Sequence, residues 1–264
     1  MGTGQQARRK PMKKSLTADR RNRIAQMLLK EGSVKVGELA QLFDVSTETI
    51  RKDIIYLEEE GIAEKNHGGA IAKVDVLERT LDEKEWLHSD EKAAIATVAL
   101  SLVPAGSAII LDTGSTTYAI AKQLVLAKGF TVFTNSVITA GLLAESDNEI
   151  FMLGGRIRTS SKAAVGNWSQ DALASIHADF AFLGSDGFKG MEGPTTLSYE
   201  EAAFKKGAIS AAKKTYVVAD GSKGKSASRF VYCKWHQVNG LITDTQAEPA
   251  MRQIVDGRAP VLSF

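Results

Sequence analysis

Hydrophobic residues follow two different periods along the chain, and the change of period divides it into two parts. In the first part apolar positions recur three or four residues apart, which predicts three short helices, each with one buried face. These positions are Ile24, Met27 and Leu28; Val36, Leu39, Ala40 and Phe43; and Ile50, Ile54 and Leu57. In the second part short apolar runs alternate with helical stretches, which predicts buried strands separated by helices.

The third predicted helix follows the second after a tight connection that runs from Phe43 to Ser46, and Ser46 is a favourable N-cap. Two helices joined this closely form a helix-turn-helix. The outward face of the third helix starts with short hydrogen-bonding and cationic side chains. Such side chains are typical of a recognition helix whose first turns reach base edges in the major groove. The expected DNA contacts on this helix are Ser46, Thr47, Thr49, Arg51 and Lys52.

A hairpin is expected after the third helix. Glu58 to Gly61 ends that helix, and residues 62–70 place Gly68 and Gly69 where a hairpin turn needs them. Three helices and a hairpin predict a winged helix-turn-helix domain over residues 15–73, with double-stranded DNA as its partner.

Charge is distributed unevenly between the two parts. The net charge of the chain is +2, but residues 1–73 hold 14 Lys and Arg against 10 Asp and Glu, whereas residues 74–264 hold 19 against 21. Before residue 24 the cations face a single acid, Asp19. A flexible basic arm over residues 1–14 would release condensed counterions on binding phosphate, which supports DNA as the partner.

The remaining chain predicts an α/β domain over residues 90–264, joined to the first by a polar linker over residues 74–89. A helix is expected over 90–103, and further helices over 116–127, 136–145 and 200–212. Buried strands are expected over 107–111, 130–134, 149–153, 179–183, 215–219 and 238–243. Alternation of such strands with helices predicts a mostly parallel, Rossmann-like sheet that is covered on both faces.

Polar residues gather where these strands end, which is where open α/β sheets bind ligands. The segments are Asp112 to Thr117, Thr134 to Ser136, Gly154 to Arg156, Gly184 to Gly187 and Asp220 to Lys223. Gly114 permits close backbone approach, and a helix N-terminus after it favours an anion. Hydroxyls, cations and acids together suggest a phosphorylated sugar or polyol as ligand. The alternative for each loop is that small polar residues merely turn the chain.

The first part of the chain resembles the DeoR-type helix-turn-helix. The signature spacing is matched by Arg20, Ile24, Leu28, Ser46, Thr49, Ile50, Arg51, Lys52, Asp53 and Ile54. The family's wing usually reads Arg-Arg-x-His-Gly-Gly, and here it reads Glu64-Lys65-Asn66-His67-Gly68-Gly69, so an acid stands where the family tends to place a cation. The resemblance implies that Lys65 and His67 join the recognition helix on DNA.

The second part resembles the DeoR-family sensor domain, which is similar in fold to ribose-5-phosphate isomerase and glucosamine-6-phosphate deaminase. The resemblance extends from Arg20 to about Asp244 and includes a Thr…Glu-Ala…Lys segment from Thr195 to Lys205; Gly221 departs from the family's usual Asp-Ser-Ser-Lys. The implied effector contacts are Asp112, Gly114, Ser115, Thr116, Thr117, Asn135, Arg156, Asp186, Glu201, Lys205 and Lys223.

The resemblance implies a function for the whole chain. We expect a repressor of a carbohydrate catabolic operon that acts as a homodimer or homotetramer on repeated half-sites. A phosphorylated sugar, sugar alcohol or amino sugar would release it from its operator, and no cofactor is expected.

Two enzyme alternatives remain at the sequence level. Ala219, Gly224, Lys225 and Ser226 fit a relaxed P-loop pattern, but residues 228–232 read as extended chain rather than the helix that a P-loop precedes. A sugar-phosphate isomerase or deaminase would need a general acid or base, and Asp186, Glu200 or Glu201 could serve. A metal enzyme is not indicated, because the four histidines lack ligand spacing.

The composition of the chain indicates in which cellular compartment the protein is expected. No apolar run reaches the ~18 residues of a transmembrane helix. The basic N-terminus lacks the apolar core of a secretory signal. A single cysteine, Cys233, excludes an internal disulfide and fits a reducing compartment. We therefore expect a cytoplasmic protein without a membrane partner.

Overall fold

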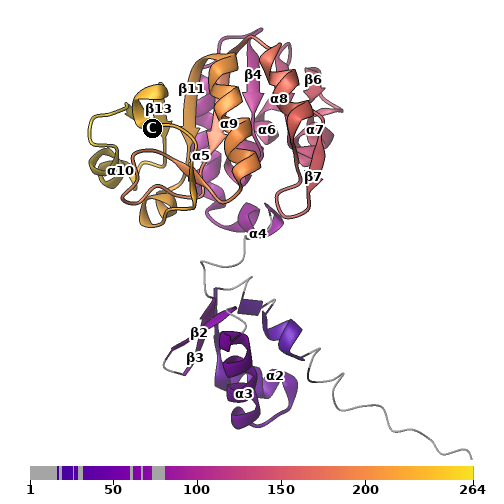
Figure 1. Cartoon of the computed structure of the whole chain (residues 1–264), viewed down its shortest axis with the longest axis vertical. Coiled ribbons are helices and arrows are strands. Elements are labelled where there is room, and N and C mark those ends of the chain that lie inside the picture. Colours follow the sequence, from indigo (N-terminus) through magenta and orange to yellow (C-terminus); the bar gives the residue numbers. More distant parts are fainter. Residues whose placement is uncertain are drawn as a thin grey trace, which may run out of the picture. The chain divides into compact units, whose positions relative to one another are not determined.

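The structure, a computed structural model, describes residues 17, 20–25, 27–28, 32–59, 62–66, 68–72 and 81–263 (Figure 1). The chain divides into two units, Met1–Arg79 and Thr80–Phe264. The expected basic arm over residues 1–14 lies outside the described residues, as does His67.

The first unit is a small helical domain with a sheet at its edge. Residues 20–25 and 27–28 are helical, followed by α2 (Val36–Phe43) and α3 (Thr47–Glu59). Strands β1 (Ser33–Lys35), β3 (Gly69–Ala72) and β2 (Ala63–Asn66) form an antiparallel sheet in that order. β1 was not expected from the sequence, because Ser33, Val34 and Lys35 are too few residues to show a period.

The apolar stripes expected for the three helices meet in one core. Its buried members include Ile24 and Leu28 from the first helical segment, Leu39 from α2, and Ile50, Ile54 and Leu57 from α3. Helices joined by the short turn at Asp44, which has a left-handed φ of 50°, together with the β2–β3 hairpin make a winged helix-turn-helix.

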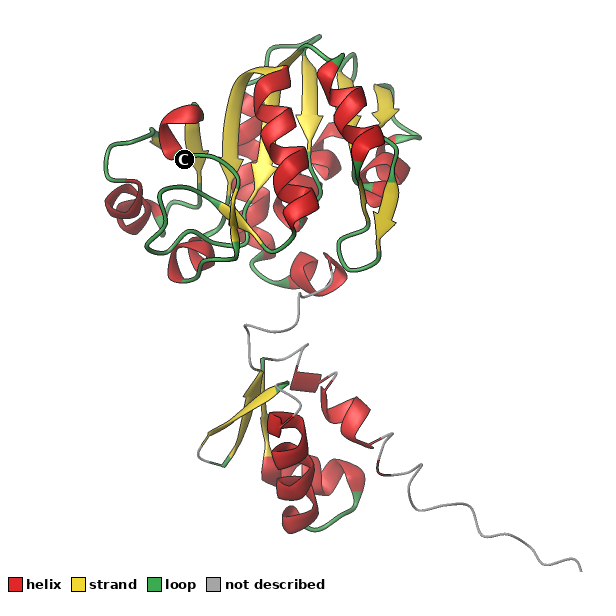
Figure 2. Cartoon of the chain, viewed as in Figure 1, coloured by secondary structure: helices red, strands yellow, loops and turns green. Residues whose placement is uncertain are grey.

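The second unit is built on a parallel sheet of seven strands in the order β14-β13-β11-β9-β4-β5-β6 (Figure 2). Its strands are β4 (Ala108–Leu111), β5 (Thr131–Thr134), β6 (Glu149–Met152), β9 (Ala178–Gly184), β11 (Ala212–Val218), β13 (Gly240–Ile242) and β14 (Val261–Leu262). Two small antiparallel pairs flank it, β7 (Arg156–Arg158) with β8 (Ala163–Val165) and β10 (Thr195–Thr196) with β12 (Phe230–Val231).

Helices cover both faces of this sheet, as the alternation of strands and helices predicted. They are α4 (Leu81–Trp86), α5 (Ser89–Ser101), α6 (Ser115–Leu124), α7 (Val137–Leu143), α8 (Asn167–Ala174), α9 (Tyr199–Ala211) and α10 (Glu248–Val255). The 3₁₀ turns η1 (Gly221–Lys225) and η2 (Trp235–Gln237) complete the unit.

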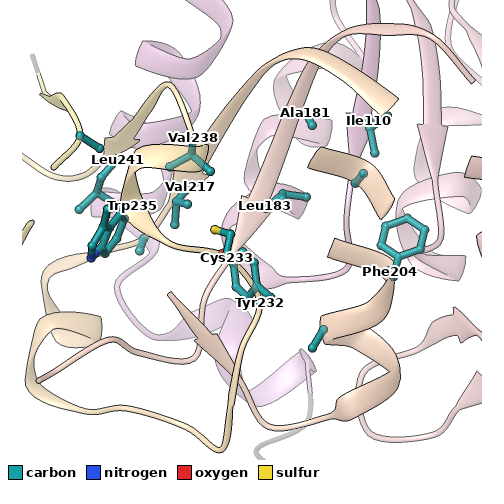
Figure 3. Packing of buried hydrophobic residues seen from close by; sticks show 14 of the residues in the cluster. Ile110, Ala181, Leu183, Phe204, Val217, Tyr232, Cys233, Trp235, Val238 and Leu241 are labelled. Carbon is teal, nitrogen blue, oxygen red and sulfur yellow. The ribbon is translucent and has the colours of Figure 1, made fainter. Parts of the chain in front are cut away.

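Successive strand residues point to opposite faces, so each face has its own apolar core. On one face Ile109 and Leu111 pack with α5, α6 and α7. On the other face Ile110 and Leu183 pack with α8, α9 and α10, and Figure 3 shows Phe204 of α9 among this group.

The structure differs from the expected linker over residues 74–89. Residues 73–80 lie outside the described residues, but Leu81–Trp86 form α4 and Ser89 begins α5. Leu81 is buried, and its backbone N–H donates to the carbonyl of Ser160. The segment is polar because α4 is a short surface helix held by tertiary contacts, and such helices show little apolar period.

Candidate functional site

The first turns of α3 are exposed. Ser46 caps the helix, because its hydroxyl accepts from the backbone N–H of Thr49 at 3.2 Å. Thr47, Arg51 and Lys52 are exposed, while Thr49 is partly buried. Arg51 has an ion pair with Glu48 at 3.8 Å, with both side chains more than 60 % exposed, so the contact is weak and leaves the guanidinium accessible to DNA.

The β2–β3 hairpin has the form of a wing. Gly68 has a φ of 89°, which glycine tolerates, and a Cβ on Gly69 would lie 1.9 Å from the carbonyl oxygen of Val34. Both glycines are therefore required by the backbone. Lys65 is exposed on β2, and its N–H donates to Glu58 of α3 at 3.1 Å, which ties the hairpin to α3.

A buried carboxylate fixes α3 against the first helical segment, residues 20–25. Asp53 is 1 % exposed, and its two oxygens accept from Nε of Arg20 at 2.6 Å and Nε of Arg21 at 2.8 Å. Arg21 also lies over the ring of Tyr56, 3.9 Å from its centroid. Two of the cations counted near the basic arm are thus part of the fold of the helical domain.

In the second unit, Thr80–Phe264, the strand order reverses between β4 and β9. From β4 the chain proceeds outward through β5 and β6, and from β9 it proceeds outward through β11, β13 and β14 on the other side. Ligands of open α/β sheets bind at such a switch point, beyond the carboxyl ends of the strands. Asp112 follows β4 and Gly184 ends β9, and the N–H of Gly184 donates to both carboxylate oxygens of Asp112 at 3.1–3.2 Å.

Lys205 of α9 reaches this point from one face of the sheet. Its Nζ donates to Oδ2 of Asp112 and, at 3.0 Å, to the carbonyl of Gly184. Burial raises the pKa of Asp112 above its ordinary value, although the charge of Lys205 opposes that shift. Tyr232 completes the surroundings, since its hydroxyl donates to the same carbonyl at 2.9 Å.

Asp186 lies in the loop after β9 and accepts three hydrogen bonds. Its partners are Nζ of Lys84 at 2.8 Å, the hydroxyl of Thr196 at 3.2 Å and the N–H of Leu197 at 3.0 Å. Burial raises the pKa of this carboxyl, but the charge and hydrogen bond of Lys84, the N–H of Leu197 and the charge of Lys205 together outweigh it, so the pKa of Asp186 lies below its ordinary value.

Glu201 in the first turn of α9 adds a third carboxylate. Its Oε1 accepts from Arg158 and from the hydroxyl of Ser161, each at 2.6 Å, and its Oε2 accepts from Thr196 at 3.4 Å. The single hydroxyl proton of Thr196 is within reach of both carboxylates, so Thr196 stands between Asp186 and Glu201. We call Lys84, Asp112, Arg158, Asp186, Thr196, Glu201 and Lys205 the polar cluster.

The structure brings four of the predicted effector residues into the polar cluster or directly beside it: Asp112, Asp186, Glu201 and Lys205. Gly114 precedes the first turn of α6 without a side-chain cap, which leaves the N–H groups of that turn free of side-chain competition. Ser115, Thr116 and Thr117 form the turn itself. The hydroxyl of Thr117 donates to the carbonyls of Asp112 and Gly114, so its role in the loop is internal.

The other predicted effector residues lie outside the polar cluster. Asn135 is buried after β5, its amide donates to the carbonyl of Ala164, and its Oδ1 has no hydrogen-bond partner among the described residues. Arg156 is 65 % exposed and pairs with Glu200 at 2.5 Å. Lys223 lies in η1, where its charge helps to lower the pKa of the buried Asp220.

Sequence reasoning missed Lys84 and Arg158. Lys84 was placed in the linker, and Arg158 stands two residues after Arg156 on β7, where a strand had not been expected. The i, i+2 spacing of the two arginines places them on one face of β7, which could have suggested Arg158 as an alternative.

A cavity of about 600 Å³ lies apart from the polar cluster, beside η1 and α10. Its lining includes His88, Ser222, Lys225 and Asp244, and none of the predicted effector residues. The relaxed P-loop pattern falls here, but Gly221–Lys225 is a 3₁₀ turn and the chain continues into β12 rather than a helix. The geometry does not support a nucleotide-binding P-loop.

Two family models match the sequence. Residues 20–74 match the DeoR-like helix-turn-helix domain, and residues 87–245 match the DeoR C terminal sensor domain. The chain belongs to the DeoR family. This DeoR-family protein is therefore a DNA-binding transcriptional regulator rather than an enzyme, as the helix-turn-helix and sensor signatures predicted.

Similar proteins cover most of the chain. A protein of Escherichia coli O157:H7, whose name proposes that it is the aga operon transcriptional repressor, is 32% identical over 86% of this chain and 86% of its own. The regulator GolR of Listeria innocua is 32% identical over 92% of this chain and 97% of its own. The transcriptional repressor CsqR of Escherichia coli K12 is 27% identical over 88% of this chain and 90% of its own.

Among solved structures, ribose 5-phosphate isomerase A of Methanocaldococcus jannaschii matches 52% of this chain and 54% of its own, with a TM-score of 0.38 and 19% identity. The described residues of the regulator contain no group of three His, Cys, Asp or Glu side chains that could hold a metal ion. Nor is any helix within those residues long and apolar enough to cross a membrane.

Proposed function

We propose that this DeoR-family regulator represses a carbohydrate catabolic operon and is released from its operator by a phosphorylated sugar, sugar alcohol or amino sugar. The observation that carries the proposal is the polar cluster at the switch point between β4 and β9. Three carboxylates and three cations meet there, beside an uncapped helix N-terminus. Carboxylates suit sugar hydroxyls, and cations with free N–H groups suit a phosphate.

The DNA-binding half of the proposal rests on the winged helix-turn-helix over residues 15–73. Ser46, Thr47, Thr49, Arg51 and Lys52 would contact the operator, with Lys65 and His67 from the wing. Because two copies on one duplex read two half-sites, we expect a homodimer or homotetramer. The genome of a bacterium is in its cytoplasm, so the regulator acts there.

The effector half assigns roles to the residues of the sensor unit. Gly114, Ser115 and Thr116 would hold the phosphate at the start of α6. Asp112, Asp186 and Glu201 would accept from sugar hydroxyls, and Asn135 offers a buried amide oxygen without a hydrogen-bond partner in the described part of the chain. Thr117, Arg156, Lys205 and Lys223 complete the proposed site.

A thermal-shift panel tests the effector half. The full chain is heated with ribose 5-phosphate, fructose 6-phosphate, sorbitol 6-phosphate or glucosamine 6-phosphate, each paired with its unphosphorylated parent. A ligand that binds the folded state at about 100 times its Kd raises the unfolding free energy by about 2.7 kcal/mol. We expect a stabilising compound only among the phosphorylated members, and it should release operator DNA in a gel shift. Turnover of any of them at enzymatic rates would contradict the proposal.

A further inference from the structure

The three ion pairs of the polar cluster differ in burial. In the pair of Lys205 and Asp112 the side chains are 4% and 1% exposed, and in that of Arg158 and Glu201 they are 18% and 8% exposed. In the pair of Lys84 and Asp186 they are 25% and 26% exposed. Lys84 is thus the cation of the cluster with the easiest access from solvent.

The pairs also differ in how well the carboxylate would be satisfied if its cation left the ion pair. Taking Lys205 away would strand the buried carboxylate of Asp112, which is costly because an unpaired charge would remain out of water. Taking Lys84 away would leave Asp186 with the hydroxyl of Thr196 and the N–H of Leu197, both on Oδ2. The Asp186 side chain is 26% exposed, so water could replace Lys84 at Oδ1, the oxygen that accepts from it. The Lys84 pair is the one that can exchange partners at least cost.

Lys84 belongs to α4, which is fastened to the sensor unit on several sides. Nζ of the buried Lys92 donates to the carbonyls of Lys84 and Leu87 at the end of that helix. Glu85 pairs with Lys122 of α6 at 2.9 Å. These contacts place α4 against α6, the helix whose uncapped N-terminus stands beside the cluster.

We infer that Lys84 is an effector ligand that exchanges Asp186 for the effector's anionic group. The inference rests on the proposed function, since it names the cation that the phosphate would take from the cluster. A phosphate at the cluster competes with the carboxylate of Asp186 for the same ammonium group. Binding therefore replaces one of the contacts that fix α4. In sequence, only residues 73–80 separate α4 from the winged helix-turn-helix, so the exchange occurs at the first element of the sensor unit.

Titration with inorganic phosphate tests the exchange at Lys84 separately from sugar recognition. Inorganic phosphate has no sugar hydroxyls that could donate hydrogen bonds to Asp186. The full chain is titrated at constant ionic strength with chloride as the reference anion, and binding is followed by thermal shift. Lys84→Met should weaken phosphate binding about tenfold or more, because a charge-assisted hydrogen bond is lost. Lys84→Arg should retain binding. Asp186→Asn should bind phosphate more tightly, because the competing anion has been removed.

Lys122→Met is the matched control. It removes one lysine and one ion pair of α4, that with Glu85, but does not touch the polar cluster, so phosphate binding should stay within about twofold of wild type. Parallel weakening in Lys84→Met and Asp186→Asn would overturn the inference, because the pair would then be a structural support. Wild-type affinity in Lys84→Met would overturn it as well. If the wild-type chain responds to neither phosphate nor any sugar phosphate, the proposed function itself fails.

Discussion

Arg51 is the side chain on which the reading of DNA can be tested most directly. It is exposed on α3, and its ion pair with Glu48 is on the surface. Arg51→Ala should weaken specific operator binding by about 1–3 kcal/mol if the guanidinium reads a base. If it contacts phosphate instead, the loss should be similar on all sequences, and the salt dependence should fall by about one charge. Gel-shift titration at several salt concentrations separates the two results.

The control for this substitution removes the same charge elsewhere. Lys206 is exposed on α9 of the sensor unit, so Lys206→Ala should leave operator affinity unchanged. If Arg51→Ala and Lys206→Ala behave alike, α3 is not the recognition helix.

Asp53 should matter for the stability of the helical domain rather than for contact with DNA. Asp53→Asn removes the charge that both arginines share, and charge-assisted hydrogen bonds contribute about 1.5–3 kcal/mol each when partly buried. Arg20 and Arg21 can be rehydrated, so we expect the total loss to be about 1–3 kcal/mol. Hydrogen exchange of α3 amides, measured by mass spectrometry, should speed up accordingly.

Glu48→Gln is a suitable comparison, because it breaks the exposed pair with Arg51 on the same helix. An exposed pair contributes about 0–1 kcal/mol, so exchange in α3 should change little. If Asp53→Asn and Glu48→Gln change the exchange of α3 amides equally, the burial of Asp53 adds nothing to the stability of the helical domain.

At the scale of elements, the attachment of α4 depends on a lysine with an unusual pKa. Burial lowers the pKa of Lys92 from 10.5 to about 8, with Lys223 and Lys84 acting in the same direction and Asp220 and Glu91 against it. Between pH 8 and 10.5 the unfolded chain holds a proton that the folded chain has released. The contribution of Lys92 to the free energy of unfolding therefore rises with pH across that window, by up to about 1.4 kcal/mol per pH unit.

Lys92→Met should remove this rise in stability with pH. The variant must be compared with wild type, because other groups also change the stability over the same pH range. Burial raises the pKa of Cys233 to about 12 and also raises that of Tyr232, so both groups make the folded state less stable as the solution becomes alkaline. The difference between the two urea unfolding curves, measured from pH 7 to 10.5, cancels those contributions. A difference that is flat with pH would contradict a depressed pKa for Lys92.

The elements that could be predicted from the sequence are those whose burial is periodic. Strands β4, β5 and β9 are apolar runs, and the stripes of α2 and α3 recur at helical spacing. Helix α4 was missed because its residues are mostly polar and its position depends on distant partners, such as Ser160 for Leu81. Strands β7 and β8 were missed because three residues each are too few to show a period. Helix α10 was also missed, although Pro249 near its start is a typical helix signal.

The same distinction explains which site residues were found. Asp112 directly follows β4 and Asp186 lies two residues after the end of β9, so the rule that ligands bind beyond strand ends identifies them. Lys84 and Arg158 follow no such strand, and only the folded chain brings them to the carboxylates. Lys205 and Glu201 were expected from family resemblance, but Arg158, the partner of Glu201, was not.

For the whole molecule, the proposed function requires that two sites on separate units influence each other. The winged helix-turn-helix and the polar cluster have no residue in common, so any effect of effector on DNA binding is a coupling free energy between distinct sites. Such couplings are typically about 1–3 kcal/mol, which corresponds to about 5–150-fold in affinity. Helix α4 is a candidate for transmitting this coupling, because an effector that takes Lys84 from Asp186 changes how α4 is attached to the sensor unit.

Coupling of this kind must act equally in both directions. If the sugar phosphate selected by the thermal-shift panel weakens operator binding by some factor, saturating operator DNA must weaken binding of that sugar phosphate by the same factor. Calorimetric titration of the full chain, with and without an operator duplex, measures the second factor, and the gel shift measures the first. A duplex of scrambled sequence at the same concentration is the control. Arg51→Ala should bind the sugar phosphate normally in the absence of DNA and lose the operator's effect at subsaturating duplex. Release of DNA without the reciprocal effect on the ligand would mean that binding of the ligand to the protein does not cause the release, and the sensor role of the polar cluster would have to be abandoned.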